Sequence, residues 1–184
     1  MFRLVSPYKY DDRYFMQSLV HYDLPSTIYL AGVTYVAKPE FHCSLLAVKR
    51  LIPRLVTDHG ISEDEAENLC VDAIQEVLTE VQPAFDGFTL EFRVATKPAE
   101  AKQTIVGMIK IVGLAEFLEK ISSHIGLDIP MPTPHVTLYT LENGLPIGLT
   151  SQAEFDTLSR PMTEVEERDW KSSVRIEILS GVTS

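Results

Sequence analysis

The sequence predicts an α+β fold, with two pseudo-symmetric lobes of antiparallel sheet and helices on the outside. Three observations lead to this class. Strand-like segments follow one another directly in the chain, which favours antiparallel pairing. Amphipathic helical segments lie between them. A strand that carries a histidine occurs once in each half, which indicates an internal duplication. We therefore expect the 184 residues to form one bilobal domain over 1–184, with 1–26 as an N-terminal segment of uncertain structure.

The first part of the chain is mixed and rich in aromatic residues, and then becomes strand-like. Residues 11–21 are expected to form a short helix. The β-branched and aromatic residues of 27–36 are typical of a strand, in which Gly32 would form a bulge. A turn over 38–40 leads to a second strand over 41–48.

The helix expected over residues 62–82 has the clearest pattern in the chain. Ser62 and Glu65 form a capping box at its start. One face is apolar at spacings of three and four residues. This face consists of Ala66, Leu69, Cys70, Ala73, Ile74, Val77, Leu78 and Val81. Because Cys70 belongs to this stripe and Cys43 to an apolar strand position, we expect both cysteines to be reduced thiols in the core.

The second half alternates strands and short helices. We expect paired strands over 88–96 and 103–113, a helix over 114–124, a strand over 135–141, a helix that starts at a capping box of Ser151 and Glu154, and a last strand over 173–179. The acidic stretch 163–169 is expected to be a solvated segment.

The charge of the chain limits its partners. The net charge is −10, from 26 acidic and 16 basic residues. Since phosphate contacts dominate the binding of long nucleic acids and need a basic surface, we do not expect a clamp on long duplex DNA or long RNA. A nucleotide, a short RNA or an RNA end is still allowed as a partner, because net charge does not describe a single cleft.

Motifs for membranes and metals are not found in the sequence. No apolar stretch approaches the roughly 20 residues that span a bilayer, and the N-terminus lacks the layout of a signal peptide. We therefore expect a soluble, cytoplasmic protein with no membrane partner. The histidines and cysteines have none of the spacings of a zinc site, so we expect no metal and no cofactor. No motif indicates the oligomeric state, and we favour a monomer.

Two segments share the pattern of a histidine, an apolar residue, a hydroxyl residue and another apolar residue. They are EFHCSLL at 40–46 and PTPHVTL at 132–138. Strands are rich in threonine and apolar residues, so a single triplet of this kind is usually structural. Two copies, each in a strand and one in each half of the chain, make a stronger case for a site.

The alternation of a strand places the polar residues of each segment on one face. His42 lies beside Ser44, and His135 lies beside Thr137 and Tyr139. The opposite faces are apolar and would anchor the strands in the core. Each strand thus presents an imidazole and a hydroxyl from a rigid support, as the floor of an active site requires.

FHCSLL and PHVTLY resemble the paired H-h-[ST]-h motifs of the 2H phosphoesterase superfamily, where h is an apolar residue. The family includes 2'-5' RNA ligases, cyclic nucleotide phosphodiesterases and RNA 3'-end processing enzymes. Chain length, motif separation and element order are similar as well, so the resemblance covers about residues 27–179. The first motif has Ser44 where threonine is commoner, a substitution that the family pattern permits.

The resemblance implies a fold and a chemistry. In the family, two lobes place the motif strands around a central cleft. His42 and His135 would then act as general acid and base on a 2',3'-cyclic phosphate or a 2'-5' phosphodiester, without a metal and with the assignment of the two roles open. Ser44 and Thr137 would donate hydrogen bonds to the phosphate oxygens. Hydrolysis and RNA ligation are both allowed.

Two tyrosines are further candidates for the site, and two functions other than a phosphoesterase are also compatible with the sequence. Tyr139 and Tyr35 are candidates for contact with the substrate, although tyrosines at such positions more often line a core. The first alternative function is a non-catalytic module that binds a nucleotide or an RNA end in the same cleft. The second is an interaction protein whose histidines are incidental.

Overall fold

The computed structural model describes residues 8–19, 24–141 and 144–174. The chain divides into two compact units. The first unit comprises residues 1–18, 44–85 and 111–132, and the second comprises 19–43, 86–110 and 133–184. The described parts of both contain helices and strands, and the strand pairs whose register is defined are antiparallel. The predicted α+β class is therefore confirmed.

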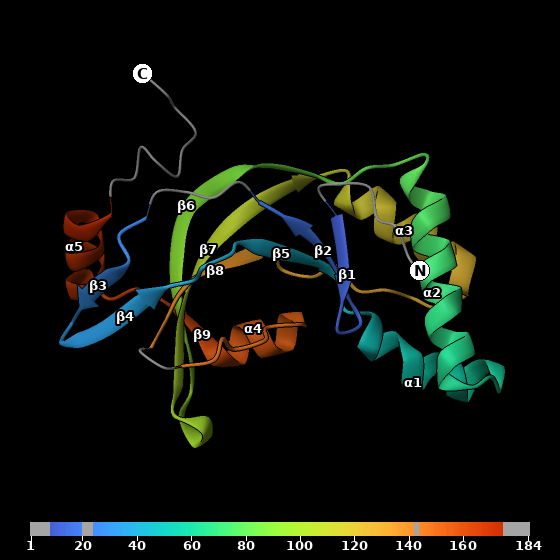
Figure 1. Cartoon of the computed structure of the whole chain (residues 1–184), viewed down its shortest axis with the longest axis horizontal. Coiled ribbons are helices and arrows are strands. Elements are labelled where there is room, and N and C mark those ends of the chain that lie inside the picture. The colour runs from blue at the N-terminus through green and yellow to red at the C-terminus, as the bar shows by residue number, and fades with distance from the viewer. Residues whose placement is uncertain (1–7, 20–23, 142–143, 175–184) are drawn as a thin grey trace. The chain divides into compact units, whose positions relative to one another are not determined.

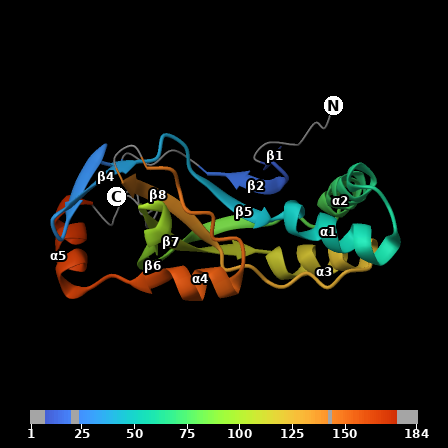
Figure 2. The ribbon, with the colours of Figure 1, turned by 90° about the horizontal axis from the view of Figure 1, so that it is seen from below.

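The first unit combines helices with a small sheet (Figure 2). Its helices are α1 (Val48–His59), α2 (Glu63–Leu78) and α3 (Leu114–Ile125). Its sheet has the order β1-β2-β5, with β1 at Tyr8–Asp11, β2 at Tyr14–Ser18 and β5 at His42–Leu46, whose first two residues belong to the second unit. Helix α2 packs against both α1 and α3. Its buried face includes Cys70, and neither Cys70 nor the buried Cys43 forms a disulfide, as predicted.

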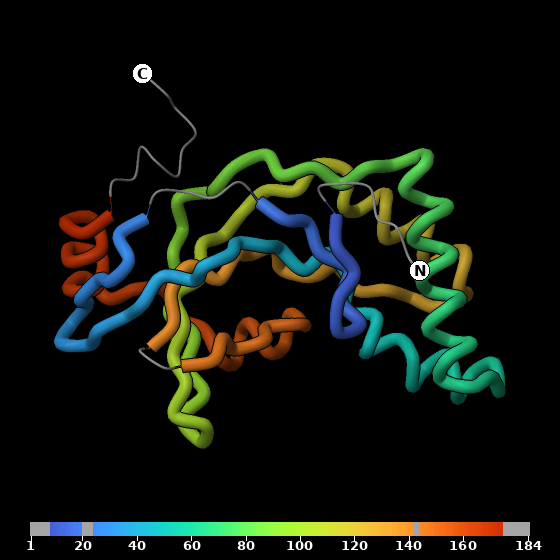
Figure 3. Tube along the Cα trace, in the orientation of Figure 1, coloured from blue at the N-terminus to red at the C-terminus, as the bar shows by residue number. Residues whose placement is uncertain are grey.

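The second unit is organised around a larger sheet with the order β3-β4-β8-β7-β6-β9 (Figure 1). The strands are β3 (Thr27–Leu30), β4 (Val33–Ala37), β6 (Ala84–Lys97), β7 (Lys102–Val112), β8 (His135–Leu141) and β9 (Ser159–Pro161). Strands β6 and β7 form a long hairpin with the short 3-10 helix η1 (Pro98–Glu100) at its tip, which the trace in Figure 3 follows. Helices α4 (Gln152–Leu158) and α5 (Glu164–Ser173) complete the described part of this unit.

The two faces of the larger sheet carry different helices. Phe155 of α4 packs in a buried cluster with Val106, and we call this side the α4 face. Trp170 of α5 meets the ring of Tyr139 edge to face at 5.9 Å, and we call that side the α5 face. Tyr139 pairs with Ile105, the neighbour of Val106 on β7. Because neighbours in a strand point to opposite faces and paired residues share one, the two helices cover opposite sides of the sheet.

The prediction of a helix over residues 11–21 is wrong for residues 11–19, and residues 20 and 21 lie outside the described part of the chain. Strands β1 and β2 form a hairpin there, and Asp12 and Arg13 make its two-residue turn with φ values of 47° and 59°. Positive φ at both turn positions matches the twist of the flanking strands. The sequence lacks the Asn-Gly or Asp-Gly pair that usually marks such a turn.

The single strand predicted over residues 27–36 is also wrong. It is the hairpin β3–β4, and its turn residues Ala31 and Gly32 have φ values of 48° and 87°. Gly32 therefore serves a turn and not a bulge. On α5, the Asp169 carboxylate accepts a hydrogen bond from the Ala31 N–H at 3.0 Å, which ties the helix to this turn.

The helices differ from prediction in two places. Helix α1 was not predicted; Pro53 lies within it, and its packed face of Val48, Leu51, Ile52 and Leu55 outweighs the cost of that proline. The acidic stretch expected to be solvated begins α5, which starts at a capping box of Thr163 and Glu166. The last predicted strand lies outside the described residues from residue 175 onward.

The capping boxes were predicted better. The box of Ser62 and Glu65 is present as predicted. Ser151 caps α4 by accepting from the Glu154 N–H, but the Glu154 carboxylate accepts from the N–H and hydroxyl of Thr150 in place of Ser151. No described helix is long and apolar enough to cross a membrane.

Candidate functional site

His135 begins β8 and is held by the short segment before it. The Pro134 carbonyl accepts a hydrogen bond from the Ile109 N–H of β7 at 3.2 Å. The Thr133 hydroxyl donates to the side chain of Gln152 on α4. The backbone that leads to His135 is therefore tied both to the sheet and to α4.

The His135 ring makes a hydrogen bond that selects its tautomer. Its Nδ1 lies 2.8 Å from the Thr133 carbonyl oxygen. A carbonyl oxygen only accepts, so the proton must be on Nδ1. In the neutral ring Nε2 is then the nitrogen with the lone pair, the form that can accept a proton from a nucleophile.

The surroundings of His135 favour this neutral form. Burial lowers the pKa of His135 below its ordinary value of 6.5, the hydrogen bond to Thr133 opposes that shift, and the nearby His42 lowers the pKa further. The ring of Phe155 packs on it with a centroid distance of 5.7 Å. His135 is therefore mostly neutral near pH 7.

The first motif lies next to the second through His42 and Cys43, which both belong to the second unit. His42 is exposed at the start of β5, and it is close enough to His135 to lower the pKa of that ring. Cys43 is 1% exposed, and burial raises the pKa of its thiol to about 12. The His135 backbone N–H donates a hydrogen bond to the Cys43 sulfur. This bond stabilises the thiolate and therefore opposes the rise of the pKa. The two histidines are thus neighbours in one compact unit.

The two hydroxyl residues of the motifs lie in different units. Thr137 pairs with Val106 and His135 pairs with Met108, so both β8 residues project from the α4 face. Thr137 is half-buried. Ser44 is also half-buried, and by the alternation of β5 its side chain lies on the same side of the strand as that of His42. Ser44 is the first residue of the segment of β5 that belongs to the first unit.

The prediction that Tyr139 shares the face of His135 is wrong. Thr137 pairs with Val106, but Tyr139 pairs with Ile105, because the register shifts at Leu138. The extra residue is a β-bulge, which reverses the alternation of the strand beyond it. Tyr139 therefore lies fully buried on the α5 face, where its hydroxyl donates to the Pro25 carbonyl at 3.0 Å.

Tyr35 lies on the same α5 face. It is 2% exposed, and its hydroxyl donates to Gln103 Oε1 at 2.6 Å. Burial, followed by the negative charge of Glu166, raises its pKa to about 12. Neither tyrosine shares the face of the histidines, so we leave both out of the proposed site.

Sequence analysis missed three residues that shape this site: Thr133, Cys43 and Phe155. Thr133 acts through its carbonyl oxygen, and any residue supplies that group, so no sequence signal could have found it. Cys43 was correctly predicted to be buried, but its contact with the second motif is a matter of tertiary structure. Phe155 lies on α4, beyond the reach of the strand pattern.

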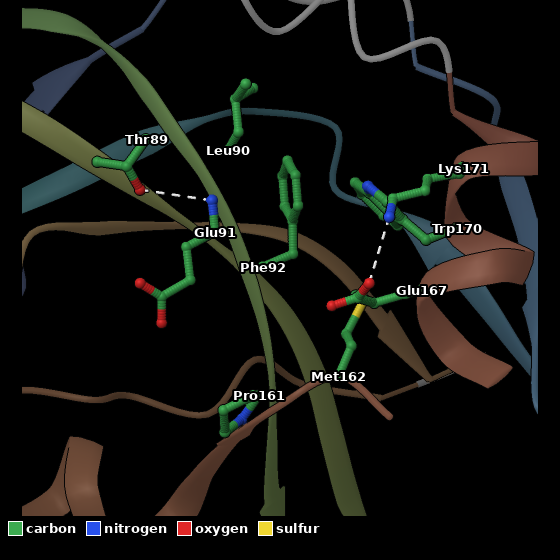
Figure 4. Close-up of a pocket in the computed structure, with 9 residues that line it drawn as sticks. All are labelled: Thr89, Leu90, Glu91, Phe92, Pro161, Met162, Glu167, Trp170 and Lys171. Carbon is green, nitrogen blue, oxygen red and sulfur yellow. Dashed lines mark hydrogen bonds and ion pairs between the residues drawn. The ribbon is translucent and has the colours of Figure 1, made fainter. Parts of the chain in front are cut away.

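A cavity of about 330 Å³ lies elsewhere in the second unit (Figure 4). Strand β6, the end of β9 with the residue after it, and helix α5 line the cavity, with Phe92, Met162 and Trp170 as its apolar wall. The buried Trp170 Nε1 has no hydrogen-bond partner among the described residues. None of the predicted site residues lines this cavity. Across the described ranges, no group of three or more histidine, cysteine or acidic side chains is placed to hold a metal ion.

Comparisons with known proteins do not identify the chain. No protein-family model matches it, and neither a curated protein nor a solved structure shows a significant match.

Proposed function

We propose that this protein is a metal-independent phosphoesterase that cleaves a 2',3'-cyclic phosphate or a 2'-5' phosphodiester. The observation that carries the proposal is the state of His135. Its Nδ1 proton is held by the Thr133 carbonyl and its pKa is lowered, which leaves Nε2 ready to accept a proton beside the exposed His42. Acid–base cleavage of a phosphodiester requires such a pair of proton acceptor and proton donor.

The proposal assigns the roles that the motifs left open. His135 is the general base and takes a proton from water through Nε2. The resulting hydroxide attacks phosphorus, the bond to one ribose oxygen breaks on the opposite side, and that oxygen receives a proton from His42. Thr137 and Ser44 are proposed to donate hydrogen bonds to the non-bridging oxygens, where negative charge increases in the transition state.

The substrate class follows from charge and resemblance. A chain of net charge −10 suits a nucleotide, an oligonucleotide or an RNA end better than a long duplex. The pseudo-symmetric lobes, the central cleft and the cytoplasmic location belong to the same proposal. If the 5' hydroxyl of a second RNA strand replaces water as the nucleophile on a 2',3'-cyclic phosphate, the bond from phosphorus to the 3' oxygen breaks, that oxygen takes the proton, and a 2'-5' linkage forms, which is the direction of RNA ligation.

Turnover on a panel of 2',3'-cyclic nucleotides and 2'-5' dinucleotides, with EDTA present, tests the proposal. We expect the wild type to open at least one of these esters, and a His42→Ala/His135→Ala double variant to lose that activity. Equal behaviour of the two proteins on the whole panel would rule out the enzyme. Binding of the same esters without turnover would instead favour the non-catalytic module.

A further inference from the structure

Lys38 is the first residue after β4, and its backbone continues the extended conformation of that strand. The Ala37 N–H donates to the Ser26 carbonyl on one side, and the Lys38 N–H donates to the Leu138 carbonyl on the other, both at 2.9 Å. Successive N–H groups that point in opposite directions are the mark of extended backbone. The side chain of Lys38 therefore lies on the same face of the sheet as that of Val36.

That face is the one that carries His135 and Thr137. Val36 pairs with Thr140 of β8, and Thr140 also pairs with Thr104 of β7. Thr104 is two residues from Val106, so it projects from the α4 face. Lys38 is thus on the α4 face, and its hydrogen bond to Leu138 places it across the strand boundary from Thr137, the residue before Leu138.

The charge of Lys38 has no partner in the described part of the chain. Of the other lysines of the second unit, Lys97 and Lys102 pair with Glu100 and Lys171 pairs with Glu167. Lys110 makes no ion pair with a described residue either, but it is exposed to solvent, whereas Lys38 is not. Lys38 is half-buried and makes no ion pair with a described residue. An ammonium that is partly removed from water without a counter-ion gains free energy when an anion binds beside it.

We propose that Lys38 binds a non-bridging oxygen of the phosphoryl group that His42 and His135 act on. This inference rests on the proposed function and adds a specificity to it. A hydrogen bond from an ammonium to a phosphate oxygen is shorter and stronger than one from the neutral Thr137 hydroxyl. The site therefore selects an anionic phosphate ester over a neutral ester of similar shape, in a protein whose overall charge repels anions.

Binding of inorganic phosphate, followed by the ring signals of His42 and His135 in NMR spectra, tests this role. The variants are Lys38→Gln, which removes the charge, and Lys38→Arg, which keeps it. Lys171→Gln is the matched control, because it removes one exposed lysine charge on α5, away from the α4 face. Unchanged histidine signals in the phosphate-free spectra show that the variants are folded.

We expect phosphate to shift the histidine signals of the wild type. The dissociation constant should rise at least about tenfold in Lys38→Gln, since a hydrogen bond to a charged group contributes about 1.5–3 kcal/mol and 1.4 kcal/mol is tenfold. Lys38→Arg and Lys171→Gln should stay within about twofold of the wild type, because both keep the ammonium or guanidinium at the site.

The outcomes separate this inference from the proposed function. If Lys38→Gln binds phosphate as the wild type does, Lys38 is not the anion-binding residue, and the acid–base pair is unaffected. If phosphate shifts neither histidine in the wild type, the anion site and the proposed function both fail. If Lys38→Gln loses phosphate binding but no ester is cleaved, the anion site stands and the phosphoesterase is wrong.

Discussion

His135 shows how much of the chemistry is decided by single contacts. The motif supplies an imidazole on a strand, but the Thr133 carbonyl decides which nitrogen carries the proton. Burial and the neighbouring His42 both lower the pKa of the ring, which favours its neutral form. The assignment of His135 as base depends on these contacts and not on the motif.

The pH dependence of kcat/KM reports on this state. A general base acts only when it is unprotonated, so the acid side of the profile follows its pKa. Because burial lowers the pKa of His135 from its ordinary value of 6.5, the acid-side midpoint of kcat/KM for a 2',3'-cyclic nucleotide should lie below pH 6.5. The profile of Lys171→Gln should be the same. A midpoint above 6.5 would contradict the assignment.

At the residue scale, the sequence predicted the shared face of His135 and Thr137 and the buried thiol of Cys43, but it misplaced Tyr139. The alternation that places His135 and Thr137 on one face holds only as far as Leu138. The bulge there is fixed by pairing with β7, and no residue of β8 marks it. A strand pattern is therefore reliable only up to the first register shift.

The bulge at Leu138 has a packing partner in β7. A Cβ added to Gly107 would lie 2.8 Å from Phe88 Cε1 and 3.1 Å from Leu138 Cδ1. Gly107→Ala should therefore lower the free energy of unfolding by about 1–3 kcal/mol, the usual cost of overpacking a core. Gly148→Ala is the control, since its nearest atom would be Thr150 Cγ2 at 3.9 Å. Equal urea midpoints for the two variants would contradict this packing.

At the element scale, α5 depends on an ion pair that no sequence pattern revealed. Arg160 donates from both terminal nitrogens to the Glu166 carboxylate, at 2.7 and 2.8 Å. These bonds, together with those from Thr163, lower the pKa of Glu166 to about 2 although burial opposes them. The 163–169 stretch was expected to be solvated because it is acidic, yet its Glu166 is 6% exposed.

Loss of this pair should destabilise the protein in a pH-dependent way. Arg160→Met should lower the free energy of unfolding near neutral pH by about 1–2 kcal/mol, less than for a fully buried pair because the Arg160 side chain is 47% exposed. Since the pKa of Glu166 is lowered from 4.5, the stabilisation is complete above 4.5 and is lost as the pH falls toward 2.

Urea unfolding of Arg160→Met and wild type, at neutral pH and at pH 3, measures this dependence. The difference between the two proteins should shrink at the lower pH. A difference that is the same at both values would show that the pair does not act through the Glu166 charge. Lys171→Gln, which removes an exposed pair, should change the stability by well under about 1 kcal/mol.

The elements themselves were predicted unevenly. Long patterns with caps, such as α2, were predicted closely because local sequence and burial agree there. The hairpin turns at Asp12-Arg13 and Ala31-Gly32 were missed because strand pairing imposes a positive φ on Arg13 and Ala31, and these residue types rarely adopt one. Helix α1 was missed because Pro53 argues against it locally, while its packed apolar face outweighs that cost.

At the scale of the whole molecule, the α+β class and the antiparallel pairing were predictable because they follow from element order. The division into two compact units cuts β5 between Cys43 and Ser44, which no change in composition marks. The internal duplication stays a prediction, since the sheet of the first unit has three strands and that of the second has six in the described chain. The net charge of −10 disfavours long nucleic acids as partners, but it does not identify a particular ligand.

The central claim is that His42 and His135 act as one acid–base pair. Kinetics of 2',3'-cyclic nucleotide hydrolysis by His42→Ala, His135→Ala and the double variant, with EDTA present, test it most directly. Each single variant should lose about 10²–10⁴-fold in kcat/KM, and the double variant should lose little more, because groups that act as a unit are not additive. Wild-type activity in either single variant would contradict the claim, as would losses that multiply in the double variant.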